Sequence, residues 1–416
     1  MILERIEVLN YKCLRYIRQR LRPFQILIGP NASGKSTFLD VLVFLQDLLQ
    51  SGVGEAVRRR ARSIRELTWR MQSDEFEIAV EFRIPERIQQ KLDEKYSLVR
   101  YEVRVGVGED GTLTLPVENL WLVHEKKRNS NPAESRIRSL PPGTIVQEPR
   151  KRTPAGYRKI MGRTADGQKV WIGSEITRWN FHLGIKSDRA GLTMIPEEEE
   201  RFPVSEWFRR MLMEGVQFLQ LNSSAMRWAC RPDAPRTFQP DGSNLPIVVE
   251  MLGEKHPKQL KRWVQHLRTV LPEIKDVLVK ERGEDNHRYL VVETFDGKFL
   301  PSWLLSDGTL RLFALTLLAY LPGEKGIYVI EEPENGVHPH ALEAVYQSLS
   351  SVYEGQVLCA THSPILLNMA NLEELLCFSR TEDGATTIVS GDQHPLLKHW
   401  QEKTALGDLL ASGILG

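Results

Sequence analysis

The segment Gly29–Ser36, GPNASGKS, is the feature that most constrains how this chain can fold. It matches the phosphate-loop pattern G-x-x-x-x-G-K-[ST], in which glycines let backbone N–H groups turn inward onto a polyphosphate. In that pattern Lys35 reaches the β- and γ-phosphates, and the Ser36 hydroxyl takes one Mg²⁺ position. The segment therefore predicts a nucleoside triphosphate as ligand, Mg²⁺ as its metal, and phosphate chemistry as the reaction class.

The residues on either side of this loop have the order that the pattern requires. Phe24–Ile28 is a short apolar run typical of a buried strand, and Thr37–Leu49 has the character of a helix. The positive N-terminus of such a helix faces the phosphates. Strand, loop and helix together predict an α/β fold of the P-loop NTPase class.

Length and composition limit the other choices. The 416 residues suffice for one large domain with an insertion, or for two to three domains. Hydrophobic residues at 41% and charged residues at 26% are ordinary for a soluble globular protein. Because the net charge is only +1, any electrostatic binding of nucleic acid must come from local patches.

The cysteines and the N-terminus bear on the compartment. Cys13, Cys230, Cys359 and Cys377 show no C-x-x-C spacing, which disfavours a zinc site or a disulfide framework and fits a reducing compartment. The N-terminus lacks the apolar core of a signal peptide, and no run approaches about 18 apolar residues. We expect a cytoplasmic protein with no membrane segment.

Alternating apolar residues predict several strands in the first third of the chain. These strands are Met1–Val8, with Ile2, Ile6 and Val8 facing a core, Phe76–Phe82, and the hairpin strands Tyr101–Val107 and Thr112–Pro116, joined by a turn at Glu109–Gly111. An antiparallel meander is therefore expected beside the phosphate-loop sheet.

The segment from Lys126 to Arg189 is polar, rich in Pro and Gly, and has many more basic than acidic residues. It is either a solvated surface insertion or a contact surface for DNA or RNA. The basic run Arg58–Arg62 has the same two interpretations. Tyr157, Trp171 and Trp179 are interleaved with the basic residues and could stack on bases, but core packing is the expected use of both tryptophans.

The second half of the chain combines helices and strands. Helices are expected at Trp207–Glu214 and Pro257–Leu271, strands at Val277–Lys280, Tyr289–Glu293, Gly326–Glu331 and Val357–Ala360, and helices alternate with strands from about Leu304 onward. Such alternation is typical of a doubly wound sheet.

Two carboxylates, Glu331 and Glu332, end the apolar strand that begins at Gly326. After a phosphate loop, one acid at a strand tip holds Mg²⁺ through water, and another orients or deprotonates the attacking water. We assign Glu331 to the metal and Glu332 to the water. The alternative is an exposed acidic strand end that opens a turn at Pro333, which the phosphate loop makes the weaker interpretation.

Two further segments contain residues suited to binding phosphate. Ser306 is a good N-cap and Gly308 permits close backbone approach, so they predict a second anion-binding helix start, with an ordinary capped helix as the alternative. Thr361-His362-Ser363-Pro364 follows the strand Val357–Ala360, where His362 can donate to a γ-phosphate oxygen.

These motifs, in this order, resemble the ABC-type ATPase heads of the SMC, RecF and OLD group, and most of all the stand-alone bacterial AAA-type predicted ATPases. The resemblance rests on GPNASGKST, on LLSDGTLRL in place of the LSGGQ signature, on IEEPENGVHP as Walker B and D-loop, and on THSP as the switch histidine. DGSNLP (Asp241–Pro246) and the closing LGDLLASGILG are similar too. The resemblance implies an ABC-type head with an antiparallel β-subdomain and an inserted, partly helical lid region. The expected parts are 1–122, 123–285 and 286–416.

The resemblance also implies that two heads sandwich two ATP molecules. The residues expected to contact ATP and Mg²⁺ in cis are Gly29, Pro30, Asn31, Ala32, Ser33, Gly34, Lys35, Ser36 and Thr37, with Glu331, Glu332 and His362, while Ser306 and Gly308 act from the partner chain. Three features depart from the family: Glu331 replaces an aspartate, Asp307 replaces a glycine, and the Q-loop residue is either Gln46 or Gln72, of which Gln72 is preferred. Tyr11 and Lys12 are candidates for the adenine contact.

Three functions fit these expectations to different degrees. The first is an ATP-hydrolysing switch that dimerises and controls a DNA-maintenance or antiphage-defence complex through a separate effector chain. The second is a slowly hydrolysing scaffold or sensor, which Asp307 and Glu331 leave open. The third, a transporter subunit, is disfavoured because its signature should follow the phosphate loop much more closely than Ser306 follows Lys35. Few residues follow Ser363, so we expect no Toprim nuclease domain.

Overall fold

The computed structural model describes residues 2–92, 96–129, 141–148, 152–323, 326–397 and 406. The chain forms two units: unit 1 contains 1–22, 30–216 and 378–388, and unit 2 contains 23–29, 217–377 and 389–416. Each unit is described by itself. The division into 1–122, 123–285 and 286–416 stays a prediction.

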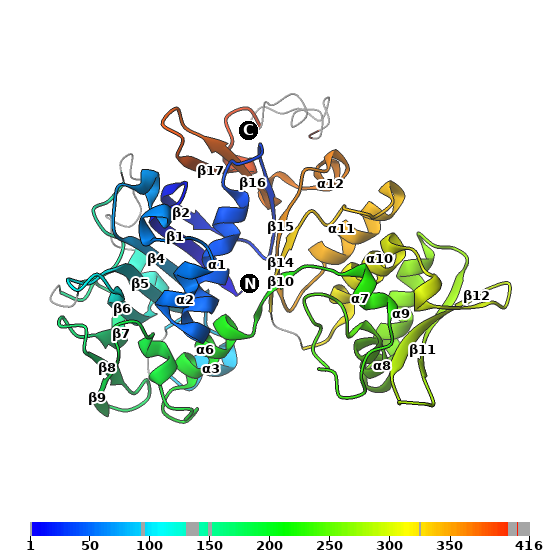
Figure 1. Cartoon of the computed structure of the whole chain (residues 1–416), viewed down its shortest axis with the longest axis horizontal. Helices are drawn as coiled ribbons and strands as arrows, with labels where there is room; N and C mark the ends of the chain where they lie inside the picture. The colour runs from blue at the N-terminus through cyan, green and yellow to red at the C-terminus, as the bar shows by residue number, and fades with distance from the viewer. Residues whose placement is uncertain are drawn as a thin grey trace. The chain divides into compact units, whose positions relative to one another are not determined.

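Unit 1 is built on an eight-stranded antiparallel sheet with the order β2-β1-β4-β5-β6-β7-β8-β9 (Figure 1). The strands are β1 (Leu3–Tyr11), β2 (Leu14–Arg20), β4 (Phe76–Arg83), β5 (Leu98–Val107), β6 (Leu113–Val123), β7 (Tyr157–Arg163), β8 (Lys169–Gly173) and β9 (Asn180–Gly184). Consecutive strands from β4 to β9 are neighbours, so the expected antiparallel meander is confirmed and extends beyond the predicted hairpin.

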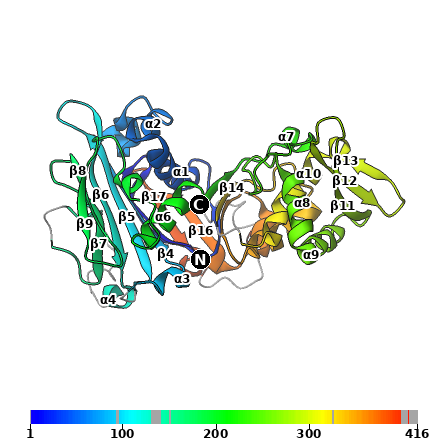
Figure 2. The same cartoon turned by 90° about the horizontal axis from the view of Figure 1, so that it is seen from below.

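Helices cover one face of this sheet (Figure 2), and the side chains on that face are apolar. These are α1 (Lys35–Ser51), α2 (Val53–Arg58) and α6 (Pro203–Met213), while α3 (Glu86–Gln89) and α4 (Glu125–Asn129) are short connections. The ring centroids of Tyr11 and Phe44 lie 5.9 Å apart, and those of Phe82 and Phe208 lie 5.1 Å apart. Burying such aromatic area is what anchors α1 and α6 to the strands.

The other face of the sheet carries charged side chains that are nevertheless buried. Arg100 lies 3.0 Å from Glu7, 3.1 Å from Glu81 and 2.7 Å from Glu102. Burial lowers the pKa of Arg100, but the three carboxylates outweigh burial and hold that pKa well above its usual value. Segment 141–148 covers this face, and its backbone N–H groups donate to carboxylates of the sheet. One face of the sheet is therefore apolar and lies under helices, whereas the other carries paired charged side chains and is covered in part by segment 141–148.

The segment between residues 126 and 189 is not simply a solvated surface insertion, because β7, β8 and β9 continue the sheet. Several of its cations serve the fold: buried Arg163 lies 3.4 Å from Glu118, and Arg158 donates to the carbonyl oxygens of Ser174 and Glu175. Core packing is also the wrong expectation for Trp179, whose side chain is 44% exposed. Residues 149–151 lie outside the described part of the chain.

Most of the six-stranded sheet, with the order β10-β14-β15-β3-β16-β17, belongs to unit 2. Its strands are β10 (Val216–Leu219), β14 (Ile327–Glu331), β15 (Gln356–Ala360), β3 (Phe24–Ile28), β16 (Leu375–Arg380) and β17 (Thr386–Ser390), of which β10, β16 and β17 are divided between the units. Because β14, β15, β3 and β16 are parallel neighbours, their carboxyl ends share one edge. The predicted strands at 24–28, 326–331 and 357–360 are confirmed.

The remainder of unit 2 contains helices and a small antiparallel sheet (Figure 2). The helices are α7 (Ser223–Arg227), α8 (Leu245–Lys255), α9 (Pro257–Arg268), α10 (Asp307–Leu317), α11 (Leu342–Ser350) and α12 (Pro364–Met369), and the strands are β11 (Ile274–Glu281), β12 (Arg288–Thr294) and β13 (Phe299–Pro301). Trp263 is fully buried and donates to the hydroxyl of Thr316 on α10 at 2.9 Å. That bond satisfies the indole N–H inside the core.

Candidate functional site

The phosphate loop requires glycine at position 34. Gly34 has φ +108°, and a Cβ atom added there would collide with the Thr386 hydroxyl and lie 3.1 Å from the sulfur of Cys13. Thr386 in turn donates to the carbonyl of Ser33 at 2.8 Å, so this contact braces the loop. Helix α1 begins directly afterwards, at Lys35. The predicted loop-to-helix arrangement is therefore confirmed.

Three polar features of this loop are suited to binding an anion. The ammonium of Lys35 donates to the carbonyl of Pro30 at 2.9 Å, and the Lys35 side chain is largely buried. Ser33 is buried, and its Oγ has no hydrogen-bond partner in the described structure. The N-terminus of α1 has no side-chain cap. Backbone N–H groups at an uncapped helix start, beside a lysine, are the kind of groups that bind anions.

A cluster of polar and charged side chains surrounds Asp40 of α1. Asp40 accepts hydrogen bonds from the Tyr11 hydroxyl at 2.7 Å, from Lys12 Nζ at 2.8 Å and from Arg60 Nε at 2.7 Å. Burial raises the pKa of Asp40, but Arg60 and Lys12 outweigh it, so the pKa lies below its usual value. Tyr11 is fully buried and cannot contact adenine, so that candidate role is wrong. The Lys12 ammonium forms an ion pair with Asp40.

The two Q-loop candidates have different surroundings. Gln46 donates to the carbonyl oxygens of Met213 and Val216, which ties α1 to the end of α6. Gln72 is exposed and lies just before β4. Gln72 therefore stays the predicted Q-loop residue, while Gln46 has a structural use. Arg58–Arg62 also has a structural use in part, because Arg60 bridges Asp40 and Asp47.

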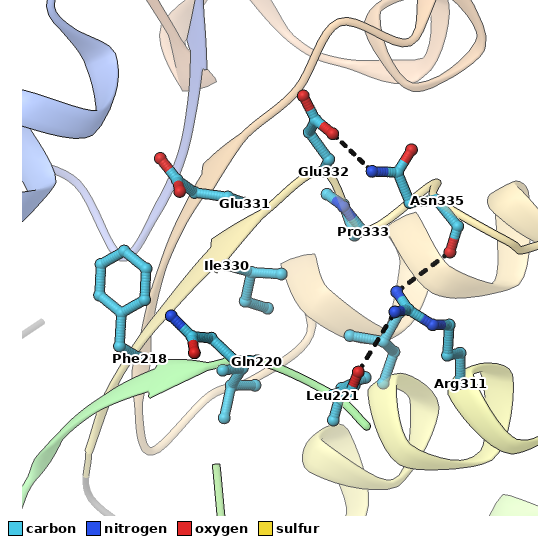
Figure 3. Close-up of a pocket in the computed structure, with 11 residues that line it drawn as sticks. Phe218, Gln220, Leu221, Arg311, Ile330, Glu331, Glu332, Pro333 and Asn335 are labelled. Carbon is cyan, nitrogen blue, oxygen red and sulfur yellow. Dashed lines mark hydrogen bonds between the residues drawn. The ribbon is translucent and has the colours of Figure 1, made fainter. Parts of the chain in front are cut away.

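The carboxyl edge of the unit 2 sheet carries the acidic pair. β14 ends at Glu331, which is exposed, and the next residue, Glu332, has φ +50° (Figure 3). This left-handed conformation costs roughly 1–2 kcal/mol in an ordinary residue. Hydrogen bonds hold it, among them one from the Glu332 N–H to the carbonyl of Ala360 at 2.7 Å and one from the Asn335 side-chain amide to the Glu332 carboxylate at 2.5 Å.

Glu334 has a role that sequence reasoning missed. Its Oε1 accepts a hydrogen bond from the Thr361 hydroxyl at 2.7 Å and another from the His362 N–H at 3.0 Å. Its Oε2 is buried and has no partner in the described structure. Glu334 therefore fixes the backbone that presents His362. The only signal was its place between two assigned motifs, in EEPENG.

The signature segment begins α10 as expected. Ser306 is the N-cap, and its hydroxyl accepts a hydrogen bond from the Thr309 N–H at 3.1 Å. Gly308 packs so closely on the carbonyl of Gly336 that no Cβ would fit. Asp307, the departure from the family pattern, forms an ion pair with Arg227 at 2.5 Å. Arg227 was not predicted, and it offsets the negative charge of Asp307.

The structure thus brings the predicted residues together in two groups. In unit 1, Pro30–Thr37 form the loop and the start of α1. In unit 2, Gly29, Glu331 and His362 lie at or just beyond the carboxyl ends of three parallel neighbours, β3, β14 and β15, at the same edge of the sheet. Residues at this edge of a parallel sheet are where ligands of such folds bind.

Ser36 and Glu331, the predicted Mg²⁺ ligands, offer chemistry that suits this metal. Both are exposed, and a hydroxyl and a carboxylate are the hard oxygen ligands that Mg²⁺ prefers. Among the described residues there is no group of three or more His, Cys, Asp or Glu that could hold a metal ion. Mg²⁺ in phosphate-loop sites uses only one or two protein ligands, with phosphate and water as the others.

The DGSNLP segment closes a loop in unit 2. Asn244 is buried and donates to the carbonyl oxygens of Pro235 and Thr237, while its own side-chain oxygen accepts from the Gln239 N–H. Gly242 has φ +74° and lies against Met226 of α7. The segment therefore supports the start of α8 and the helix that ends in Arg227. Of the closing LGDLLASGILG, only Leu406 lies within the described residues, and it is buried.

Two protein families match different parts of the chain. Residues 1–140 match the family described as "AAA ATPase domain". Residues 246–368 match the family described as "AAA domain, putative AbiEii toxin, Type IV TA system". The first match includes the phosphate loop, and the second includes the signature, the acidic pair and His362.

Single proteins give more distant similarities. Protein ea59 of Escherichia phage lambda is 39% identical over 65 residues, which is 15% of this chain and 12% of that protein. The solved structure described as the SmcHead bound to the C-winged helix domain of ScpA superimposes with a TM-score of 0.53 at 14% identity, covering 93% of this chain and 96% of that chain. This second likeness concerns the fold. No helix in the described ranges is long and apolar enough to cross a membrane.

Proposed function

We propose that this chain, an ABC-type ATPase head of the SMC- and RecF-like group, is a switch that dimerises when it binds ATP and separates after hydrolysis. The observation that carries the proposal is the phosphate loop itself. Its lysine is buried against the loop, Ser33 Oγ has no partner among described residues, and the start of α1 is uncapped. The direct test is Mg²⁺-dependent release of phosphate from ATP by the purified chain.

The proposed reaction assigns each residue a task. Lys35 and the loop N–H groups bind the phosphates, and Mg²⁺, held by Ser36 and Glu331, would neutralise charge on them. Glu332 accepts a proton from the attacking water, and His362 donates to a γ-phosphate oxygen. The Glu334 carboxylate, through the His362 N–H, sets the position of the histidine.

Dimerisation is proposed because the signature has no other evident use. Ser306 and Asp307 at the start of α10 are exposed. An N-terminus of this kind attracts phosphate, and in a two-fold dimer each chain would offer its signature to the ATP of the other. The similar solved structure is described as a head bound to a domain of ScpA, which supports a further partner chain for this protein.

Ser306→Arg is expected to prevent the dimer, because it adds bulk at a helix start that must approach phosphate. The measurement is the mass of the Glu332→Gln variant with ATP, with and without Ser306→Arg, by light scattering at micromolar concentration. Gln347→Arg on the exposed side of α11 is the matched control and should leave the dimer intact. A monomer in Glu332→Gln with bound ATP would refute the sandwich arrangement.

The effector is proposed to be a separate chain, acting in DNA maintenance or antiphage defence. A second candidate function is a scaffold or sensor that hydrolyses ATP slowly. The Arg227–Asp307 ion pair favours this candidate, because it occupies the helix start that should receive phosphate. The turnover rate of the purified chain, alone and with the products of adjacent genes, separates the two functions.

Nucleic-acid binding is proposed for part of the basic segment. Arg158 and Arg163 serve the fold, whereas Lys169, Arg178 and Lys186 on and beside β8 and β9 are exposed. The exposed indole ring of Trp179 has the Arg201 guanidinium carbon 5.0 Å from its centroid, and this ring is available to stack on an unpaired base.

Replacing Lys169, Arg178 and Lys186 with Ser should weaken DNA binding and reduce its salt dependence. On duplex DNA each lost phosphate contact changes the log–log slope by about 0.9. The measurement is fluorescence anisotropy of labelled DNA between low and high salt. The control replaces Lys258, Lys261 and Arg262 of α9, and both variants should hydrolyse ATP normally. An unchanged affinity for DNA in the variant at Lys169, Arg178 and Lys186 would mean that this basic segment has only a structural role.

A further inference from the structure

Hydrogen bonds within the loop after β14 hold the carboxylate of Glu332 in place (Figure 3). The Asn335 N–H donates to the Glu332 carbonyl at 3.0 Å, and the Asn335 side-chain amide donates to the Glu332 carboxylate at 2.5 Å. Gly336, with φ +75°, ends the loop. The direction of the Glu332 carboxylate therefore depends on where Asn335 lies.

The signature helix determines where Asn335 lies. Arg311, one turn after Gly308 on α10, donates to the carbonyl of Asn335 at 3.1 Å and to the carbonyl of Leu221 at 3.2 Å. Gly308 packs directly on the carbonyl of Gly336. Two successive carbonyl groups of the loop thus rest on α10, and a shift of this helix must move the loop or break these contacts.

The Glu332 side chain has space to move if the loop shifts. A pocket of about 270 Å³ lies beside it, lined by Arg311, Glu331, Glu332 and Asn335 together with apolar side chains from β10 and β14. Neither Glu332 nor Asn335 is packed tightly, since both are exposed. The two side chains are therefore fixed mainly by their mutual hydrogen bond and by Arg311, not by the core.

We infer that Asn335 is a positioning residue for Glu332, and that Arg311 sets Asn335 according to the position of the signature helix. This inference rests on the role proposed for Glu332. A carboxylate that must meet a water molecule gains from a fixed direction, because a misplacement of about 1 Å can cost on the order of a hundredfold in rate. The contacts would link whatever binds at Ser306 to the group that activates water.

Asn335→Ala tests the inference by steady-state kinetics. The kcat for ATP should fall about tenfold or more while KM changes by less than about twofold, because the lost contact orients Glu332 and does not bind ATP. Combined with Glu332→Gln, the same change should cause no further loss, since the two residues act as one unit. Equal losses in both backgrounds, or an unchanged kcat in Asn335→Ala, would overturn the inference.

Arg311→Ala tests the link to the signature helix without requiring hydrolysis. Hydrogen–deuterium exchange of nucleotide-free protein should show faster exchange at 332–336 in Arg311→Ala, at an unchanged melting temperature, because the Asn335 carbonyl loses the donor that holds the loop on α10. Arg231→Ala, an exposed arginine paired with Asp233, is the matched control and should leave this exchange unchanged. If 332–336 exchanges as in the wild type, Arg311 does not set the loop. If instead the wild type releases no phosphate from ATP, the proposed function fails, and the exchange result still decides the role of Arg311.

Discussion

Lys35→Ala is expected to weaken ATP binding by at least about a hundredfold and to abolish hydrolysis, because it removes a buried charge that faces the triphosphate. In the free protein the ammonium rests on the carbonyl of Pro30, a weak acceptor that phosphate oxygens can replace. Calorimetric titration of ATP with Mg²⁺ measures the loss. The circular dichroism melting curve shows whether the fold is kept.

Lys258→Ala is the matched control for this experiment, since Lys258 is an exposed lysine of α9 and should bind ATP like the wild type. ATP binding by Lys35→Ala within about threefold of the wild type would mean that the loop does not hold the triphosphate. Ser33 offers an independent check, because a bound phosphate should give its buried hydroxyl the partner that it lacks among the described residues.

Glu332→Gln is expected to lower the turnover rate by about 10²–10⁴-fold while ATP binding is retained, because the amide is nearly the same size but cannot accept the proton of water. ATP should then remain bound and the dimer should accumulate. Single-turnover phosphate release and light scattering measure the two effects. Glu343→Gln, on the exposed side of α11, is the control. Hydrolysis by Glu332→Gln at the wild-type rate would show that another group activates the water.

The Arg227–Asp307 ion pair changes how the aspartate in the signature segment is expected to act on phosphate. An aspartate alone at a phosphate-binding helix start would repel ATP, but here an arginine lies 2.5 Å away. Arg227 also donates to the carbonyl of Leu305 at 2.6 Å, so it is fixed beside the start of α10. The segment therefore presents a paired charge, which a partner chain's phosphate could reorganise. Until that happens the pair occupies the helix start, which is why it favours the slow scaffold.

Local sequence was sufficient for the parts of the site that form from adjacent residues. Phe24–Ile28, the loop Gly29–Ser36 and the start of α1 follow one another along the chain, so their glycine pattern and apolar periodicity predict strand, loop and helix directly. Ser306 as an N-cap is equally local, because its hydroxyl accepts from a residue three positions later. The acidic end of β14 was predictable for the same reason.

Only the tertiary structure decided which distant residues complete these motifs. The partners of Asp307, Asn335 and the His362 backbone are Arg227, Arg311 and Glu334, and no sequence periodicity links them. The basic segment became strands β7–β9 because an open sheet edge at β6 could pair with it, although its composition resembles a loop. Composition and local pattern record short-range preferences, whereas hydrogen bonds and ion pairs between distant residues depend on how the chain packs.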